Sequence, residues 1–239
     1  MGKKFLLTAA ILGCVLLAAG GMLRMTGGEI VTENKQSMQG ALAGVRVCID
    51  PGHGGYDGGA VGRDSGVKEK AVNLAWAKTL KAALEKEGAQ VTLTRSEDVA
   101  LAEEGKERKR RDLQERVDRA QNADIFLSLH MNEYPDRSQS GPQVFYTEGN
   151  EKGRLLAGAL QESMNEALSP VRPRSAHKGD YYVLRHQQNA CVLIECGFLS
   201  NEKEEALLMD AAYRERAAES ILRGVAQYLR LRENLANGA

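Results

Sequence analysis

Three polar segments follow apolar runs in the 239-residue sequence, and each carries a side chain that can bind a metal or move a proton. The segments are Asp50-Pro51-Gly52-His53, Ser128-Leu129-His130-Met131-Asn132 and Glu195-Cys196-Gly197. The apolar run before each of them has the composition of a β-strand. Because ligands bind beyond the carboxyl ends of the strands in an open α/β sheet, we expect the three segments to form one shared site.

Glu69 adds a fourth polar group, at the start of a predicted helix that follows a glycine-rich loop. Two histidines and one carboxylate match the ligand set of a catalytic zinc site, in which the fourth position is left for water. Zinc polarises a carbonyl group and lowers the pKa of water to about 7, which suits attack on an amide. The other carboxylate would take a proton from the water and give it to the leaving amine. Spacing alone does not decide whether Glu69 or Glu195 binds the ion.

The elements that must position these residues alternate along the chain. Strands are predicted at 45–50, 90–94, 125–129, 144–146, 181–184 and 192–194, and helices at 67–87, 98–123, 153–168 and, as one or two helices, 202–231. This alternation predicts a single three-layer α/β domain with a mostly parallel twisted sheet flanked by helices. The basic run Lys106–Arg111 is interpreted as a solvated helix face and not as a ligand-binding patch.

The first residues have the features of an export segment. Lys3 and Lys4 precede the uncharged stretch Phe5–Leu23, so Met1–Met25 is predicted to be a signal peptide or a membrane anchor. Both alternatives deliver the rest of the chain outside the cytoplasm, secreted or tethered to the membrane through this segment. The predicted order is then a linker at 26–44, a catalytic domain at 45–231 and a C-terminal tail at 232–239.

The composition excludes one class of partner. Lys plus Arg and Asp plus Glu each number 32, so the formal net charge is zero, which argues against nucleic-acid binding through bulk charge. Outside the export segment the cysteines are Cys48, Cys191 and Cys196, and Cys191 and Cys196 are expected to be buried small apolar residues. A bridge from Cys48 to Cys191 or to Cys196 stays open at this point.

The sequence resembles the zinc-dependent type 3 family of N-acetylmuramoyl-L-alanine amidases over Val45–Leu231. The matching segments are Asp50–Gly55, Glu69-Lys70 with Asn73-Leu74, Ser128–Asn132, Val183–Arg185 and Leu193–Asn201. The resemblance implies hydrolysis of the amide bond between muramic acid and L-alanine in peptidoglycan. It also implies a single zinc ion held by His53, Glu69 and His130, with Glu195 as the catalytic residue.

Within this family the chain is most similar to the germination-specific amidases of the spore cortex. The similarity lies in Gly179–Arg185, in Glu195–Phe198 and in a single domain behind a hydrophobic segment. It implies a role in forming muramic lactam in the cortex and in germination. The sequence contains no recognisable wall-binding repeats, so we expect contact with the wall to come from the catalytic groove, the membrane or a partner such as an activator protein.

Further polar residues have two interpretations each. Asp50 is expected either to orient His53 or to cap the turn. Asn132 and Arg185 are expected to hold substrate or to stabilise loops. Two other functions compete with the amidase: a catalytically inactive wall-binding or regulatory domain of the same fold, and a zinc peptidase or deacetylase that acts on the wall.

Overall fold

A six-stranded sheet forms the middle of the domain, and the computed structural model describes residues 40–238. The strands are β1 (Arg46–Pro51), β2 (Gln90–Leu93), β3 (Ile125–Asn132), β4 (Gln143–Tyr146), β5 (His177–Lys178) and β6 (Ala190–Phe198). Their order across the sheet is β2-β1-β3-β6-β4-β5. β1, β2, β3 and β6 are parallel, whereas β4 is antiparallel to β6 and β5 is parallel to β4. The prediction of a mostly parallel sheet is confirmed.

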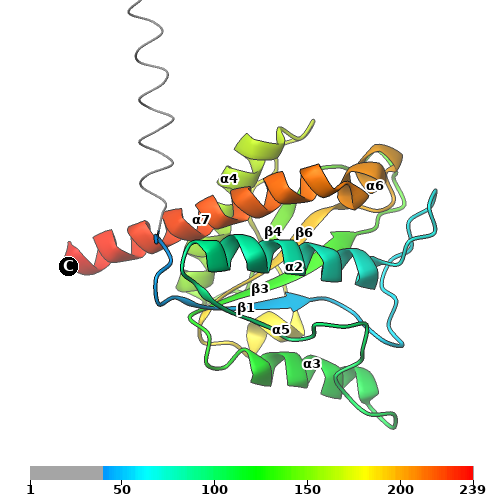
Figure 1. Cartoon of the computed structure of the whole chain (residues 1–239), viewed down its shortest axis with the longest axis horizontal. Helices are drawn as coiled ribbons and strands as arrows, with labels where there is room; N and C mark the ends of the chain where they lie inside the picture. Colours follow the sequence, from blue (N-terminus) through cyan, green and yellow to red (C-terminus); the bar gives the residue numbers. More distant parts are fainter. Residues whose placement is uncertain (1–39, 239) are drawn as a thin grey trace, which may run out of the picture. The chain divides into compact units, whose positions relative to one another are not determined.

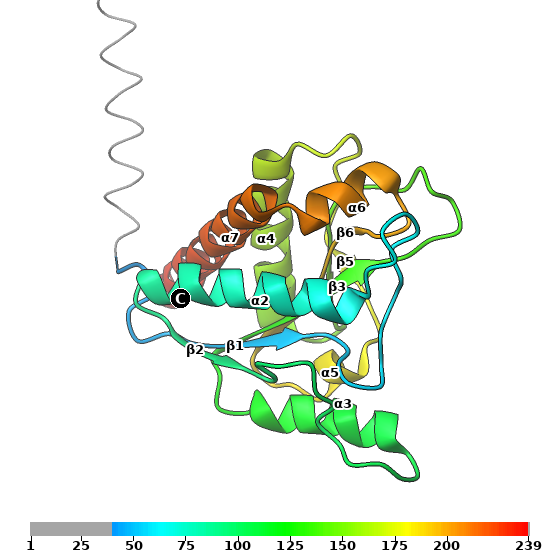
Figure 2. The same ribbon diagram turned by 45° about the vertical axis from the view of Figure 1, so that its right-hand side comes forward.

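Helices cover both faces of this sheet, which gives the predicted three layers (Figures 1 and 2). They are α2 (Glu69–Lys86), α3 (Arg108–Arg119), α4 (Glu151–Leu168), α5 (Tyr182–Arg185), α6 (Glu202–Met209) and α7 (Ala211–Asn237). One face carries α2, α4 and α7, and the other carries α3 and α5. The short helix α6 contacts β6. Among residues 40–238, no helix is both long enough and apolar enough to cross a membrane.

Alternating side chains of the strands build two cores, one on each face of the sheet. Cys48, Phe126 and Leu193 form a buried cluster with Val183 and Leu184 of α5. Their neighbours along the strands, among them Ile49, Leu127 and Ile194, are also buried, and strand alternation turns them toward the opposite layer of helices. The three cysteines of the described residues, Cys48, Cys191 and Cys196, are buried and free, so neither bridge considered from the sequence is formed.

Strand register brings the polar segments together at one edge. Asp50 and Pro51 of β1 pair with Ser128 and Leu129 of β3, and His130 of β3 pairs with Glu195 of β6. The carboxyl ends of β1, β3 and β6 therefore lie next to one another, as expected for parallel strands.

Two predicted elements differ from the structure. The segment 181–184 was expected to be extended, but α5 begins at Tyr182, because one helical turn lets Val183 and Leu184 both pack against the sheet. The helix expected over 98–123 is confined to α3. Gly105 before it has a φ of 133°, which no helix accommodates, and Arg111 donates hydrogen bonds to the carbonyls of Glu103 and Lys106 in this loop.

The ends of the domain extend beyond the predicted limits. Leu42, within the expected linker, is fully buried and donates a backbone hydrogen bond to Glu87. At the other end α7 continues to Asn237, through most of the expected tail. The predicted export segment, Met1–Met25, lies outside the described residues.

Candidate active site

His53 occupies the tight loop that follows β1. Its φ is 62°, a left-handed conformation that residues with a side chain rarely adopt. The preceding Gly52 lies against His130, since a Cβ atom at Gly52 would be 2.3 Å from the His130 ring. Gly59 allows a second close approach, because a Cβ there would lie 2.4 Å from Glu69 Oε2. These two glycines let the side chains of the site approach one another.

Glu69 is the first residue of α2, and its carboxylate is buried and fully hydrogen-bonded. Oε2 accepts from the backbone N–H of Ala60 at 2.8 Å, and Oε1 accepts from the backbone N–H of Met131 at 3.0 Å. The side-chain amide of Asn73, one helical turn further along α2, donates to Oε1 at 3.1 Å. The carboxylate is thus fixed by the glycine loop, by β3 and by its own helix.

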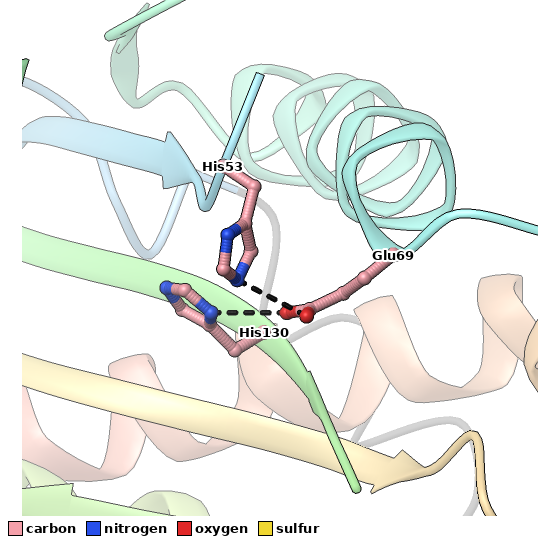
Figure 3. Close-up of side chains that lie close together, drawn as sticks. All are labelled: His53, Glu69 and His130. Carbon is pink, nitrogen blue, oxygen red and sulfur yellow. Dashed lines mark hydrogen bonds and ion pairs between the residues drawn. The ribbon is translucent and has the colours of Figure 1, made fainter. Parts of the chain in front are cut away.

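Two imidazoles converge on this carboxylate (Figure 3). His53 Nε2 lies 3.0 Å from Glu69 Oε2, and His130 Nδ1 lies 3.0 Å from Glu69 Oε1. The two rings meet edge to face with their centroids 4.8 Å apart. One ligand atom from each of the three residues lies within 4.8 Å of the others, so the group can hold a metal ion. Two nitrogens and one carboxylate oxygen are donors that Zn²⁺ accepts, and this donor set fits the predicted metal.

The electrostatics keep Glu69 ionised. Burial alone would raise its pKa, but the hydrogen bonds and positive charge of His130 and His53 outweigh burial and lower the pKa well below its usual range. The histidine rings themselves are about one fifth exposed, at 19% for His53 and 21% for His130, whereas the Glu69 side chain is 4% exposed. The site is therefore open to solvent on the histidine side.

Glu195 lies beside this group in a different environment. The residue as a whole is only partly buried, but its Oε2 atom is enclosed and has no hydrogen-bond partner among residues 40–238. Burial raises the pKa of Glu195 to about 7, and the Glu69 carboxylate acts in the same direction, while His130 and His53 oppose it. A carboxyl group with this pKa can both accept and donate a proton near neutral pH.

Asp50 and Asn132, two other predicted site residues, make their hydrogen bonds to groups outside the metal-ligand group. Asp50 makes no contact with the His53 ring; it accepts from Thr94 Oγ1 at 2.6 Å and Ser128 Oγ at 2.8 Å, and it pairs with Arg116. Asn132 ends β3, where its carbonyl accepts from the Leu199 N–H, so it joins β3 to the end of β6.

Arg185 lies away from the metal-ligand group, among residues of another part of the fold. It forms an ion pair with Asp180 at 3.2 Å and lines a polar groove together with Asn150 and Gln188. Gln188 lies just before β6 begins, whereas Glu195 lies toward the carboxyl end of the same strand. Arg185 therefore faces the opposite end of β6 from the site.

Sequence reasoning missed Asp57, which approaches the outer nitrogen of His53. Asp57 Oδ1 lies 3.0 Å from His53 Nδ1, at ion-pair distance but not in line for a hydrogen bond. A carboxylate in this position favours a proton on Nδ1 and leaves Nε2, the atom nearest Glu69, free for a metal. The carboxylate that lies beside the His53 ring is therefore that of Asp57 and not that of Asp50. An aspartate four residues after a candidate ligand in a glycine-rich loop was the available signal.

Comparison with known proteins identifies the class of enzyme. The N-acetylmuramoyl-L-alanine amidase family model matches residues 47–227, so the chain belongs to this amidase family. The germination-specific N-acetylmuramoyl-L-alanine amidase of Bacillus subtilis is 35% identical over 193 residues, covering 78% of this chain and 81% of the relative. The chain is accordingly an N-acetylmuramoyl-L-alanine amidase with peptidoglycan as its substrate, and it is similar to the germination-specific members.

Solved structures agree with this assignment. The CwlD amidase of Clostridioides difficile, in complex with the GerS lipoprotein, has 34% sequence identity and a TM-score of 0.75, over 78% of this chain and 99% of that chain. The catalytic domain of CwlV, an amidase from Bacillus (Paenibacillus) polymyxa, has 33% identity and a TM-score of 0.69, over 78% of this chain and 98% of that chain. Both similarities cover more than three quarters of this chain and nearly all of the solved chains.

Proposed function

We propose that this amidase is zinc-dependent, that His53, Glu69 and His130 hold one Zn²⁺ ion, and that Glu195 is its general base. The observation that carries the proposal is the convergence of two imidazole nitrogens and one ionised carboxylate within 4.8 Å. Glu69 has the surroundings of a ligand because its position is fixed by several donors. Glu195 has the surroundings of a base because no group in the described part of the chain forms a hydrogen bond to its buried Oε2 atom.

The metal and Glu195 have different roles in the proposed reaction, which follow from these surroundings. Bound Zn²⁺ would supply Lewis-acid polarisation of the amide carbonyl and a lowered pKa for water. Glu195 accepts a proton from the attacking water, whose oxygen forms a bond to the carbonyl carbon of the muramic-acid lactyl group. The carbon–nitrogen bond then breaks, and Glu195 returns the proton to the nitrogen of L-alanine. The products are a muramic-acid carboxylate and a stem peptide with a free L-alanine amino terminus.

We further propose that the enzyme is exported and acts on the peptidoglycan of the spore cortex, in muramic lactam formation and in germination. Support comes from the similarity to the germination-specific amidase of Bacillus subtilis and from the uncharged stretch Phe5–Leu23 behind two lysines. An activator protein is proposed as a partner. The structure of the Clostridioides difficile amidase in complex with a lipoprotein supports a partner of that kind.

The test is digestion of purified peptidoglycan with identification of the products by mass spectrometry. We expect new L-alanine amino termini, their loss when a chelator removes the metal, and their return when Zn²⁺ is added. The Glu195→Ala variant is the matched control for contaminating hydrolases. Release of acetate in place of L-alanine termini would indicate a deacetylase. Full activity of metal-free enzyme would refute zinc dependence.

A further inference from the structure

Two buried arginines outside the metal-ligand group hold the loop that carries His53. Arg95 is 2% exposed and Arg116 is 3% exposed, so both guanidinium groups lie inside the protein. Arg95 follows β2, and Arg116 belongs to α3. Both are far from the loop in sequence, yet both point their donors at it. We call Arg95 and Arg116 the arginine pair.

The arginine pair donates to three successive carbonyl groups of the loop. Pro51 accepts from Arg95 Nε at 2.9 Å and from Arg116 Nη1 at 3.0 Å. Gly52 accepts from Arg95 Nη2 at 3.0 Å, and His53 accepts from Arg116 Nη2 at 2.7 Å. A run of carbonyls turned toward buried cations fixes the path of the backbone residue by residue.

Arg95 also connects this loop to the helix that carries Glu69. Its Nη2 donates to the Lys70 carbonyl at 2.8 Å, next to Glu69 in the first turn of α2. One guanidinium therefore spans the backbone on both sides of the site. The distance between the His53 loop and the Glu69 helix is set by a rigid planar group and not by flexible side chains.

Arg116 is itself fixed by two carboxylates. Asp112, one turn earlier on α3, accepts from Nε at 2.9 Å, and Asp50 accepts from Nη1 at 2.6 Å. The Asp50 carboxylate thus influences His53 through Arg116. The two carboxylates compensate the buried charge of Arg116, and its Nη2 atom is directed at the His53 carbonyl.

The need for such support lies in the backbone of His53. Its left-handed conformation, with φ of 62°, persists in a residue with a side chain only where surrounding contacts enforce it. Within residues 40–238, Arg116 is the side chain with a hydrogen bond to the His53 carbonyl. Without that contact the loop can relax, and the imidazole would leave its place beside Glu69.

We propose that Arg95 and Arg116 are positioning residues of the metal centre, which hold the His53 and Glu69 backbones so that the ligand group is assembled before the ion binds. This inference rests on the proposed zinc function. A preorganised site loses less conformational freedom on binding, so loss of the arginine pair weakens metal affinity beyond any effect on folding.

The test measures Zn²⁺ affinity of metal-free protein by calorimetric titration for wild type, Arg116→Lys and Arg95→Lys. Lysine keeps the charge but cannot donate to several acceptors in a fixed fork. We expect both variants to fold by circular dichroism and to bind Zn²⁺ about 10–100-fold more weakly, the usual effect of residues that orient ligands. Turnover at limiting zinc should fall by a similar factor and recover in excess zinc.

Two control variants separate positioning from general destabilisation. Arg119→Lys makes the same exchange on the same helix, but the Arg119 side chain donates to the Thr94 carbonyl and not to the His53 loop. Ser163→Ala removes a buried hydrogen bond between α4 and α7, far from the loop in the fold. Both controls should keep the Zn²⁺ affinity of wild type, even where urea titration shows lower stability.

The outcomes distinguish this inference from the proposed function. If wild type does not bind Zn²⁺, the proposed function fails. If wild type binds and both lysine variants bind equally well, the arginine pair has only a structural role and the inference is overturned. Should one lysine variant not fold, the other decides, because each arginine contacts the loop independently.

Discussion

The two glutamates of the site lie in opposite environments. Glu69, the first residue of α2, accepts hydrogen bonds from two backbone amides and from Asn73, and its pKa is lowered because the two histidines outweigh burial. Glu195, on β6, has an enclosed oxygen without a partner, and burial raises its pKa to about 7. The same functional group is thus kept charged and immobile at the start of a helix and left without a hydrogen bond on one oxygen in a strand.

Under the proposed function, this difference separates metal binding from proton transfer. A ligand must stay ionised and keep its place, so it benefits from many fixed donors. A general base must change its protonation during the reaction, which fixed donors to the ionised form would oppose. The contrast supports Glu69 as the ligand and Glu195 as the base, a choice that spacing along the chain leaves open.

The largest expected effect comes from removing a ligand. His130→Ala deletes the ring that lies 3.0 Å from Glu69 and packs against Gly52, so the donor set is no longer complete. We expect zinc content after dialysis to fall sharply and amidase activity to be lost, as measured by elemental analysis and by product release. Retention of one zinc ion per chain in this variant would contradict the ligand assignment.

Removing the base should separate the two properties. Glu195→Ala leaves the three ligands in place, so zinc content should match wild type while turnover falls by about 10²–10⁴-fold, the usual contribution of a general acid–base group. Elemental analysis and kcat are measured on the same preparation. Loss of zinc together with activity would mean that Glu195 binds the metal, and the contrast between the glutamates would break down.

Stability should depend on the buried pair beneath the histidine loop. Asp50→Asn leaves the Arg116 charge without its 2.6 Å partner, and breaking such a buried pair costs about 3–5 kcal/mol. Urea titration at pH 7 measures this loss in the free energy of unfolding. Asp124→Asn, which removes an exposed pair with Arg46, is the matched control and should change the stability much less.

The pH dependence of this effect has a defined sign. Burial would raise the pKa of Asp50, but Arg116, Thr94 and Ser128 outweigh it, so the folded pKa lies below the unfolded one. Stability from the ionised carboxylate is therefore complete above the unfolded pKa of about 3.9 and is lost as the pH falls through the folded pKa. The gap between wild type and Asp50→Asn should narrow in acid, and a gap that widens there would contradict this assignment.

The smallest expected effect sharpens the ligand side of the comparison. Asp57→Asn exchanges the carboxylate 3.0 Å from His53 Nδ1 for a neutral amide, which orients the imidazole less firmly. Zinc affinity should fall by about 10–100-fold with little change in folding stability. Competition with a chromogenic chelator measures the affinity, and an unchanged value would leave Asp57 without a role at the metal centre.

Much of this enzyme follows from local sequence. The apolar runs before His53, His130 and Glu195 determine strands, and parallel strands must deliver their ends to one edge of the sheet. The glycines around His53 indicate close contacts in this loop, and Gly52 and Gly59 make such contacts. The layer order and the candidate metal-ligand group could therefore be predicted from the residue pattern and strand geometry. The choice of Glu69 also required the resemblance to known amidases.

Other features depend on contacts between distant residues, which no local pattern encodes. Arg116 lies next to Val117 on the buried face of α3. Its hydrogen bond to the His53 carbonyl exists only because the fold brings α3 under the His53 loop. The helical turn of α5 buries Val183 and Leu184 against the sheet, and β4 pairs with β6 in the antiparallel direction. The sequence by itself placed His53, His130 and Glu195 at the carboxyl ends of neighbouring strands, but it did not reveal Asp57 beside His53 and it wrongly grouped Arg185 with them. Tertiary structure alone decided which charges are satisfied there, because burial and partners across the fold set the pKa and orientation of each group.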